Sequence, residues 1–181
     1  MIFTETPLPG AFIIEINKIG DERGFFGRSW CKNEMEEHGL NGNLAQINTS
    51  LSKNKATLRG LHYQVDPYAE SKMIRCTKGA VFDVIVDIRP NSPTFLKWFG
   101  ETLTESNHKA LYSPEGFAQG FITLEDDTEI TYFTTQFYAP GSDWGVRYND
   151  PQVGIEWPLK PAVISEKDIN WPDFDVKYLK K

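Results

Sequence analysis

The segment at residues 57–64, TLRGLHYQ, holds one of only three histidines in the chain. A histidine has a pKa near neutrality, so His62 is suited to take up and return a proton at physiological pH. On a strand, His62 shares a face with Gly60, where a glycine lets another segment or a ligand approach closely, and Arg59 lies on the opposite face. The simpler interpretation is a half-buried histidine bonded to a backbone carbonyl, and these residues alone favour it.

A metal site does not fit the histidine pattern. Metal sites in small β-barrels use two or three histidines with a carboxylate, often as His-x-His. His38 and His108 are isolated in polar segments, and no His-x-His occurs. We therefore expect no bound metal.

Other polar residues with chemical potential each have an ordinary structural alternative. Tyr132 stands among threonines. It is either a packing residue with a solvated hydroxyl or a general acid whose hydroxyl points into a cavity. Asp168, in the segment SEKD, is typical of a helix start or a loop, and Lys72 of a solvated strand end. Arg23 and Arg59 are expected to be ordinary surface arginines, with a binding role only where an anionic ligand lies near them.

The elements that position these residues are predicted to be strands of one domain, residues 1–181. An aromatic share of 13%, with 14 glycines and 11 prolines, favours a turn-rich all-β fold. Short strands are expected at residues 11–19, 25–30, 44–51, 57–64, 73–77, 80–88, 98–103, 109–113, 120–124 and 129–137. This number and spacing predict a sandwich or barrel whose interior admits a small ligand.

Two further local patterns are informative. Residues 80–88 alternate between a wholly apolar face and a face with Asp83 and Asp87, which is solvated, ion-paired or part of a polar cavity. A short helix is predicted at residues 32–38, ended by Gly39 in a left-handed conformation. The tail, residues 166–181, has room for another short helix.

Composition narrows the classes of partner. The net charge of −6 argues against a nucleic-acid polymer, but a few arginines can still hold a small anion. No apolar run spans a bilayer and the first residues lack a signal-peptide pattern, so no membrane partner is expected. Cys31 and Cys76 lack CxxC spacing and indicate reduced thiols in a cytoplasmic protein more than a long-range disulfide.

Short motifs follow one another in a fixed order: DERGxF at 21–26, QxN at 46–48, RGLHYQ at 59–64, Lys72, VxVDIR at 84–89, PEGFAxGF at 114–121, YxTT at 132–135, YxP at 138–140 and SEKD at 165–168. In this order and spacing the chain resembles the dTDP-4-dehydrorhamnose 3,5-epimerase family over nearly its whole length. The resemblance implies a cupin-type jelly roll, a homodimer, no cofactor, and a cytoplasmic isomerase of deoxysugar and polysaccharide biosynthesis.

The implied substrate is a nucleotide-diphosphate-linked 4-keto-6-deoxyhexose, inverted at C3 and/or C5, as from dTDP-4-dehydro-6-deoxyglucose to dTDP-4-dehydrorhamnose. The resemblance implies His62 as the base, oriented by Asp168, Tyr132 as the acid, and Lys72 near the sugar carbonyl. It implies Arg59 at the diphosphate. The nucleoside is expected at Arg23 and Phe26, from the same chain or the partner subunit, and the remaining cleft positions are Gln46, Asn48, Tyr138 and Lys167.

Three candidate substrate-binding positions differ from the family pattern. Gln119 replaces the usual histidine of PEGFAHGF, and because an amide cannot shuttle a proton, inversion at both carbons or at one stays open. Arg28 replaces the usual glutamate near the nucleoside, which leaves CDP- and GDP-linked sugars open besides dTDP. Asp143 stands near a usual glutamate and keeps its charge. A ketoisomerase and a non-catalytic sugar-nucleotide-binding cupin are the remaining alternatives.

Overall fold

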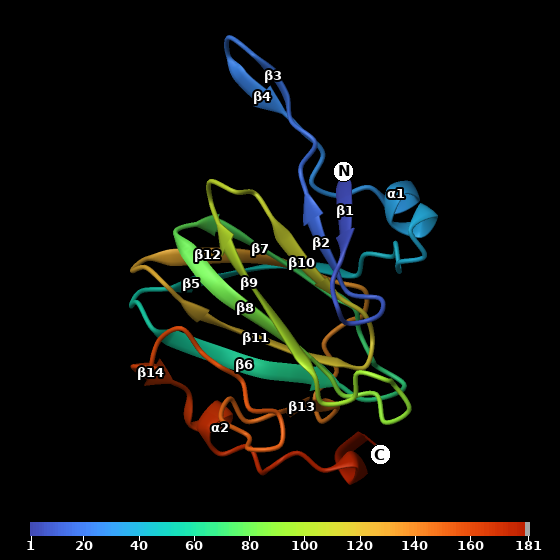
Figure 1. Ribbon diagram of the computed structural model, residues 1–181, viewed down its shortest axis with the longest axis vertical. Coiled ribbons are helices and arrows are strands. Elements are labelled where there is room, and N and C mark those ends of the chain that lie inside the picture. Colours follow the sequence, from blue (N-terminus) through green and yellow to red (C-terminus); the bar gives the residue numbers. More distant parts are fainter. Residues whose placement is uncertain (180–181) are drawn as a thin grey trace.

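Two sheets face each other and form the body of the molecule (Figure 1). The structure is a computed structural model that describes residues 1–179. The first sheet has the order β1 (Ile2–Glu5), β2 (Phe12–Glu15), β10 (Ala110–Ser113), β7 (Lys72–Lys78), β12 (Thr128–Thr134) and β5 (Gln46–Ser52). The second has the order β13 (Asp143–Gly145), β6 (Thr57–Gln64), β11 (Phe117–Thr123), β8 (Ala80–Asp87) and β9 (Trp98–Thr104). β14 (Val163–Ile164) pairs in parallel with β6, and the other pairings are antiparallel.

The remaining elements are short. β3 (Ile19–Asp21) and β4 (Gly24–Phe26) form a hairpin that projects from the body at the top of Figure 1. The helices are α1 (Lys32–Glu37), α2 (Glu166–Ile169) and the 3₁₀ helix η1 (Val176–Leu179). The all-β prediction is therefore confirmed. Within residues 1–179, every helix is too short or too polar to cross a bilayer.

Apolar side chains are buried in layers on both faces of the second sheet. Val81 and Ile85 of β8 pack between the two sheets, against residues such as Ile130 of β12. Val84 and Val86, on the other face of β8, pack beneath the chain that follows β13, together with residues such as Phe174. The wholly apolar face predicted for residues 80–88 thus lies under the C-terminal segment.

The two carboxylates of β8 have different environments. Asp83 lies between the sheets and is fully buried. Asp87, at the strand end, accepts hydrogen bonds from Arg89 Nε at 2.8 Å and from Ser92 and Thr94. The polar face of residues 80–88 is therefore ion-paired at one end and buried in the interior at the other.

The projecting hairpin explains where the predicted strands differ from the observed ones. The strand expected at residues 11–19 is interrupted, because β2 ends at Glu15 and β3 begins at Ile19, and the strand expected at 25–30 ends at Phe26. A Cβ atom at Gly27 would lie 2.0 Å from Ile16 Cγ2, so the two segments cross in close contact at the base of the hairpin. The helix predicted at residues 32–38 is confirmed as α1, and Gly39 after it has φ +72°.

Candidate active site

A cavity of about 640 Å³ opens between the two sheets. It is lined from both sides, by β6 and β11 of one sheet and by β5, β7 and β12 of the other, and α2 closes one end. This volume suits a ligand of drug or cofactor size. The candidate residues that line it are Gln46, Asn48, Arg59, His62, Lys72, Gln119, Tyr132, Tyr138, Asp143, Lys167 and Asp168.

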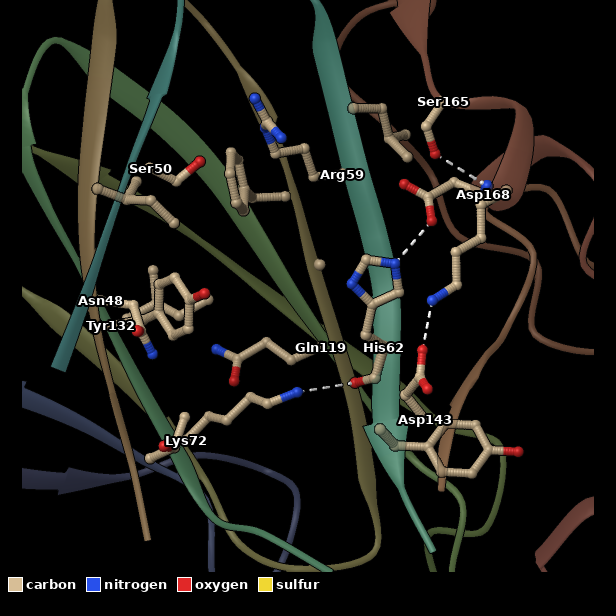
Figure 2. Close-up of a pocket in the computed structure, with 18 of the residues that line it drawn as sticks. Asn48, Ser50, Arg59, His62, Lys72, Gln119, Tyr132, Asp143, Ser165 and Asp168 are labelled. Atoms are coloured by element: carbon tan, nitrogen blue, oxygen red, sulfur yellow. Dashed lines mark hydrogen bonds and ion pairs between the residues drawn. The ribbon is translucent and has the colours of Figure 1, made fainter. Parts of the chain in front are cut away.

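His62 and Asp168 form a hydrogen-bonded pair at this cavity. His62 Nε2 lies 2.6 Å from Asp168 Oδ1, although 106 residues separate them in the chain. With Nε2 bound to the carboxylate, the other ring nitrogen, Nδ1, is the one directed into the cavity (Figure 2). A carboxylate that holds one imidazole nitrogen in this way fixes the tautomer and leaves the second nitrogen free to act as a base.

Asp168 is itself held by its local structure. It is buried, its backbone N–H donates to Ser165 Oγ at the start of α2, and its Oδ2 accepts the Gly60 N–H at 3.3 Å. Burial raises the pKa of the Asp168 carboxyl, but the hydrogen bonds and the His62 charge outweigh it and hold the pKa below its ordinary value. Asp168 is therefore ionised at neutral pH, which is the state that an orienting carboxylate requires.

β6 brings Arg59 and His62 to the same cavity, against the simple alternation. The pairing of β6 with β11 shifts register between Gln119 and Phe121, as in a β-bulge, and Gly60 has φ +112° at that point. A Cβ atom at Gly60 would lie 2.6 Å from Gly120 Cα, so only glycine fits. The prediction that Arg59 lies on the opposite face from His62 is therefore wrong. The bulge shifts the alternation by one residue, so that side chains before and after it reach the same face. The close approach expected at Gly60 is confirmed.

Tyr132 stands on the opposite wall from His62 (Figure 2). It extends from β12 of the first sheet with Ile130 and Thr134, as the alternation predicts, and its side chain is half-buried. Burial raises the pKa of the Tyr132 phenol, the Glu70 charge raises it further, and the Arg59 charge lowers it. A phenol with a raised pKa keeps its proton at neutral pH and is available as a donor.

Lys72 lies at the base of the cavity between these walls (Figure 2). Its ammonium Nζ is 2.8 Å from Glu70 Oε1 and donates to the carbonyl oxygen of His62 at 3.3 Å. Glu70 also lines the cavity. An ammonium here can stabilise negative charge that develops on a ligand oxygen.

Gln119 faces the cavity from β11, directly opposite His62 in the strand pairing. Its Nε2 donates to Asp83 Oδ2 and its Oε1 accepts from Ser113 Oγ, both at 2.7 Å. These two bonds fix the orientation of the amide and leave one N–H of Nε2 for a ligand. The pocket therefore has a neutral hydrogen-bond donor beside the imidazole.

The other end of the cavity is polar and partly ion-paired. Asp143 accepts hydrogen bonds from Lys167 and, at 3.3 Å, from the Tyr138 hydroxyl, and the Tyr138 backbone N–H donates to Gln46 Oε1 at 2.9 Å. Burial raises the pKa of the Asp143 carboxyl, but Lys167 outweighs it and the net pKa is lowered.

Arg59 differs from the other cavity cations. Its guanidinium bonds to Ser52 Oγ at 3.1 Å and to the Leu51 carbonyl at 3.3 Å. Among the described residues it makes no ion pair with a carboxylate, whereas Lys72 and Lys167 each do. Arg59 is thus the cavity cation whose charge is available to an anionic ligand.

Three candidate residues lie outside the cavity of their own chain. Arg23 and Phe26 are on the projecting hairpin and are exposed, Phe26 at 72%, and Arg23 pairs with Asp21 beside it. Arg28 pairs with Glu34 of α1. The chain alone does not bring the hairpin residues to His62.

Motif matching missed Glu70, which completes the cavity wall. Alternation was enough to find it, because Glu70, Lys72 and Ile74 have the same parity and all line the cavity. Glu70 lies outside the predicted strand, residues 73–77, so the alternation has to be extended beyond that strand to include it. No cluster of three or more His, Cys, Asp or Glu side chains suited to a metal occurs within residues 1–179.

Comparison with known proteins adds to this geometry. The family model described as dTDP-4-dehydrorhamnose 3,5-epimerase matches residues 5–175. The chain is 46% identical over 171 residues to the dTDP-4-dehydrorhamnose 3,5-epimerase of Shigella flexneri, covering 94% of each. A crystal structure of the Elizabethkingia anophelis enzyme of that name has 40% identity and a TM-score of 0.93, covering 96% of each chain.

A solved structure with a bound sugar nucleotide is also similar. The Legionella pneumophila epimerase in complex with dTDP-4-keto-L-rhamnose is 41% identical, with a TM-score of 0.86, over 92% of this chain and 89% of that one. The jelly-roll prediction is confirmed by these neighbours. The family match, the relatives and the shared fold show together that the chain belongs to the dTDP-4-dehydrorhamnose 3,5-epimerase family.

Proposed function

We propose that the protein is an isomerase that converts dTDP-4-dehydro-6-deoxyglucose to dTDP-4-dehydrorhamnose by inverting stereocentres next to the C4 ketone. The observation that carries this proposal is the arrangement across the cavity. A histidine base oriented by Asp168 stands on one wall, a protonated phenol on the opposite wall, and an ammonium between them. These are the groups that epimerisation next to a ketone requires.

The ketone makes the adjacent C–H bonds acidic, because the electron pair that is left moves onto oxygen. His62 Nδ1 takes the proton, and the C–H electrons form a carbon–carbon double bond as the carbonyl becomes an enolate. The Lys72 ammonium stabilises the enolate oxygen as its charge develops. The Tyr132 phenol then donates a proton to the opposite face of the carbon. Solvent afterwards takes the extra proton from His62 and returns one to Tyr132. Substrate and product have the same oxidation state, so the cycle consumes no redox equivalent.

The diphosphate is expected at Arg59, the cavity cation without a carboxylate partner among the described residues. Gln46, Asn48, Gln119, Tyr138, Asp143 and Lys167 complete the substrate-binding set in this proposal. Arg23, Phe26 and Arg28 are proposed to contact the nucleoside across a subunit boundary, because the hairpin projects away from its own cavity.

A homodimer is therefore part of the proposal. The apolar hairpin residues Ile19 and Phe26 are 68% and 72% exposed, and Ile47 on the face of β5 away from the cavity is 56% exposed. Arg75 is only 8% exposed, yet its Nε and Nη2 have no hydrogen-bond partner within residues 1–179. Buried guanidinium groups usually have acceptors, and a second chain would supply them. The free thiols of Cys31 and Cys76 accord with a cytoplasmic location.

Incubation with dTDP-4-dehydro-6-deoxyglucose in heavy water tests the function. NMR of the product is expected to show deuterium at C3 and C5, and His62→Ala is expected to lose about 10²–10⁴-fold in the rate of exchange. A control variant, His38→Ala, removes a histidine that contacts Phe3 outside the cavity and is expected to exchange normally. No exchange by the unaltered protein would contradict the function, and normal exchange by His62→Ala would contradict the base.

Inversion at one carbon only is the second candidate. Gln119 favours it, because its amide is fixed by Asp83 and Ser113 and cannot relay a proton as an imidazole does. The same experiment separates the two candidates, since one labelled carbon indicates a single inversion and two indicate both.

A further inference from the structure

Glu70 is an acidic side chain in the cavity wall to which the proposed reaction gives no role. Its side chain is 9% exposed, and it makes its ion pair with Lys72, whose side chain is 14% exposed. The Nζ–Oε1 distance of 2.8 Å is that of a direct charge-assisted hydrogen bond. A carboxylate so near the enolate-stabilising ammonium weakens its net positive charge, so its presence calls for a reason.

Glu70 and the His62 carbonyl together anchor the ammonium. Lys72 has three N–H donors, of which one points to Glu70 and one to His62 O at 3.3 Å. One donor is left for a substrate oxygen. A lysine has a long and flexible side chain, and two fixed contacts remove most of that freedom before the substrate arrives.

The other carboxylate near Lys72 cannot serve as its counter-ion. Asp83 is fully buried, its Oδ2 is bonded to Gln119, and its Oδ1 has no partner within the described chain. Burial raises the pKa of Asp83 well above its ordinary value, even though Gln119 and Lys72 act in the opposite direction. This leaves Glu70 as the fixed negative charge next to Lys72.

Glu70 also acts on the proposed acid. After burial, its charge is the second cause of the raised pKa of Tyr132, and Arg59 opposes it. The groups that face Lys72 and Tyr132 from the surrounding strands are Arg59 and His62 of β6, Asp83 of β8, and the neutral amides Asn48 of β5 and Gln119 of β11. Glu70, by contrast, contacts the Lys72 ammonium directly.

We propose that Glu70 is a positioning residue for the epimerase reaction, which anchors the Lys72 ammonium and places a negative charge near the Tyr132 phenol. This inference rests on the proposed function. The Glu70 carboxylate has two opposed effects. It weakens the net positive charge of the Lys72 ammonium, but it fixes the position of the ammonium and extends activity to higher pH.

Two substitutions separate the anchor from the charge. Glu70→Gln keeps an oxygen that accepts from Lys72 Nζ but removes the negative charge. Glu70→Ala removes both. Glu101→Gln is the matched control, because Glu101 pairs with Lys109 at a similar distance, 2.9 Å, outside the cavity.

The readouts are kcat and KM against pH, and the NMR order parameter of the Lys72 side chain in the same variants. For Glu70→Gln, the alkaline limit of kcat is expected at lower pH, because the Glu70 charge helps to raise the pKa of Tyr132, while the Lys72 side chain stays ordered. For Glu70→Ala, kcat is expected to fall about 10²-fold because the ammonium is misplaced, with little change in KM. Glu70→Asp, with the charge kept and the anchor shortened, is expected to recover the alkaline limit but only part of kcat.

The inference is overturned if Glu70→Gln leaves the alkaline limit of kcat, and Glu70→Ala the order of the Lys72 side chain, where they are in the Glu101→Gln control. A Glu70→Ala protein that does not fold would not rescue it, since Glu70→Gln decides the charge effect alone. The order of the Lys72 side chain is measured without substrate, so it decides the anchoring even if the unaltered protein has no epimerase activity. That outcome would contradict the proposed function separately.

Discussion

Asp168 shows how much of the site depends on one buried carboxylate. Its hydrogen bond to His62 Nε2 selects the imidazole tautomer. In the proposed mechanism, its charge also stabilises the imidazolium that forms when His62 takes a proton. Asp168→Asn keeps the size of the side chain but removes the charge. We expect at least a 10²-fold loss in deuterium exchange into the substrate.

The same substitution has a stability effect that depends on pH in a known direction. The pKa of folded Asp168 lies below its ordinary value, so its ionised form stabilises the fold above the unfolded pKa of about 3.9. As pH falls through the lowered folded pKa, this stabilisation is lost. Asp168→Asn is therefore expected to cost about 1.5–3 kcal/mol near pH 7 and less below pH 4, as measured by urea unfolding.

Asp175→Asn is the control for both measurements, because Asp175 also forms an ion pair, with Lys177, but lies on the surface. It is expected to leave exchange unchanged and to lower stability less than Asp168→Asn does, because a solvent-exposed ion pair contributes little. A constant stability difference between Asp168→Asn and the unaltered protein from pH 7 to pH 3 would argue against the ionised pair.

Individual residues differed in how far the sequence could predict them. Tyr132 followed from alternation along its strand, and its neighbours Ile130 and Thr134 do line the cavity with it. Local pattern alone does not connect His62 with Asp168, because the contact joins residues 106 apart; only the family motifs indicated it. Glu70 was missed because it lies two residues before β7, outside both the motifs and the predicted strand.

At the scale of the element, β6 controls the site through its bulge. Gly60 lets β6 and β11 approach closely and turns Arg59 toward the side that His62 occupies. Gly60→Ala would place a Cβ atom 2.6 Å from Gly120 Cα and 2.9 Å from the Gln119 carbonyl, with φ at +112°. We expect it to cost about 2–5 kcal/mol of stability and most of the epimerase activity.

Gly141→Ala separates the two causes of that cost. Gly141 also has a positive φ, +87°, but a Cβ atom there would meet nothing within 4 Å. Its replacement is expected to cost only about 1 kcal/mol, from backbone conformation alone. Equal thermal stability of the two variants would show that the approach of β6 to β11 is not the cause.

The strand pattern was predictable and the bulge was not. Alternation located β6 at Thr57–Gln64, with the bounds that the structure has. Alternation assumes a regular strand, however, and the β-bulge at Gly60 interrupts that regular geometry. The early ends of β2 and β4 have a similar origin, since the crossing at Gly27 and Ile16 is a tertiary contact that no local period contains.

At the scale of the whole molecule, the fold separates the residues of one predicted site. Most of them line the cavity between the sheets, but the hairpin with Arg23 and Phe26 projects away from it (Figure 1). The composition predicted the all-β fold, because aromatic residues, glycine and proline reflect strands and turns. Composition does not predict whether the hairpin contacts the cavity of its own chain or that of a second subunit. Contacts between subunits do not alter the periodicity of the sequence of one chain.

Phe26→Ala tests whether a second chain completes the nucleoside end. The unaltered protein is expected to have a mass of twice 20.7 kDa by light scattering. Because Phe26 is 72% exposed in its own chain, its removal should leave the stability of the single chain nearly unchanged. If its ring stacks on the base in the partner's cavity, dTDP should bind about tenfold more weakly, a loss of about 1.4 kcal/mol.

Val176→Ala is the control for this loss, because Val176 is also exposed, at 47%, but lies in η1, far from the hairpin in the chain. It is expected to bind dTDP as the unaltered protein does in calorimetric titration. GDP and CDP, titrated in parallel, test the base, since Arg28 next to the hairpin offers donors where an acidic residue would offer acceptors. A monomeric protein that binds dTDP equally well with and without Phe26 would show that each chain builds its site alone.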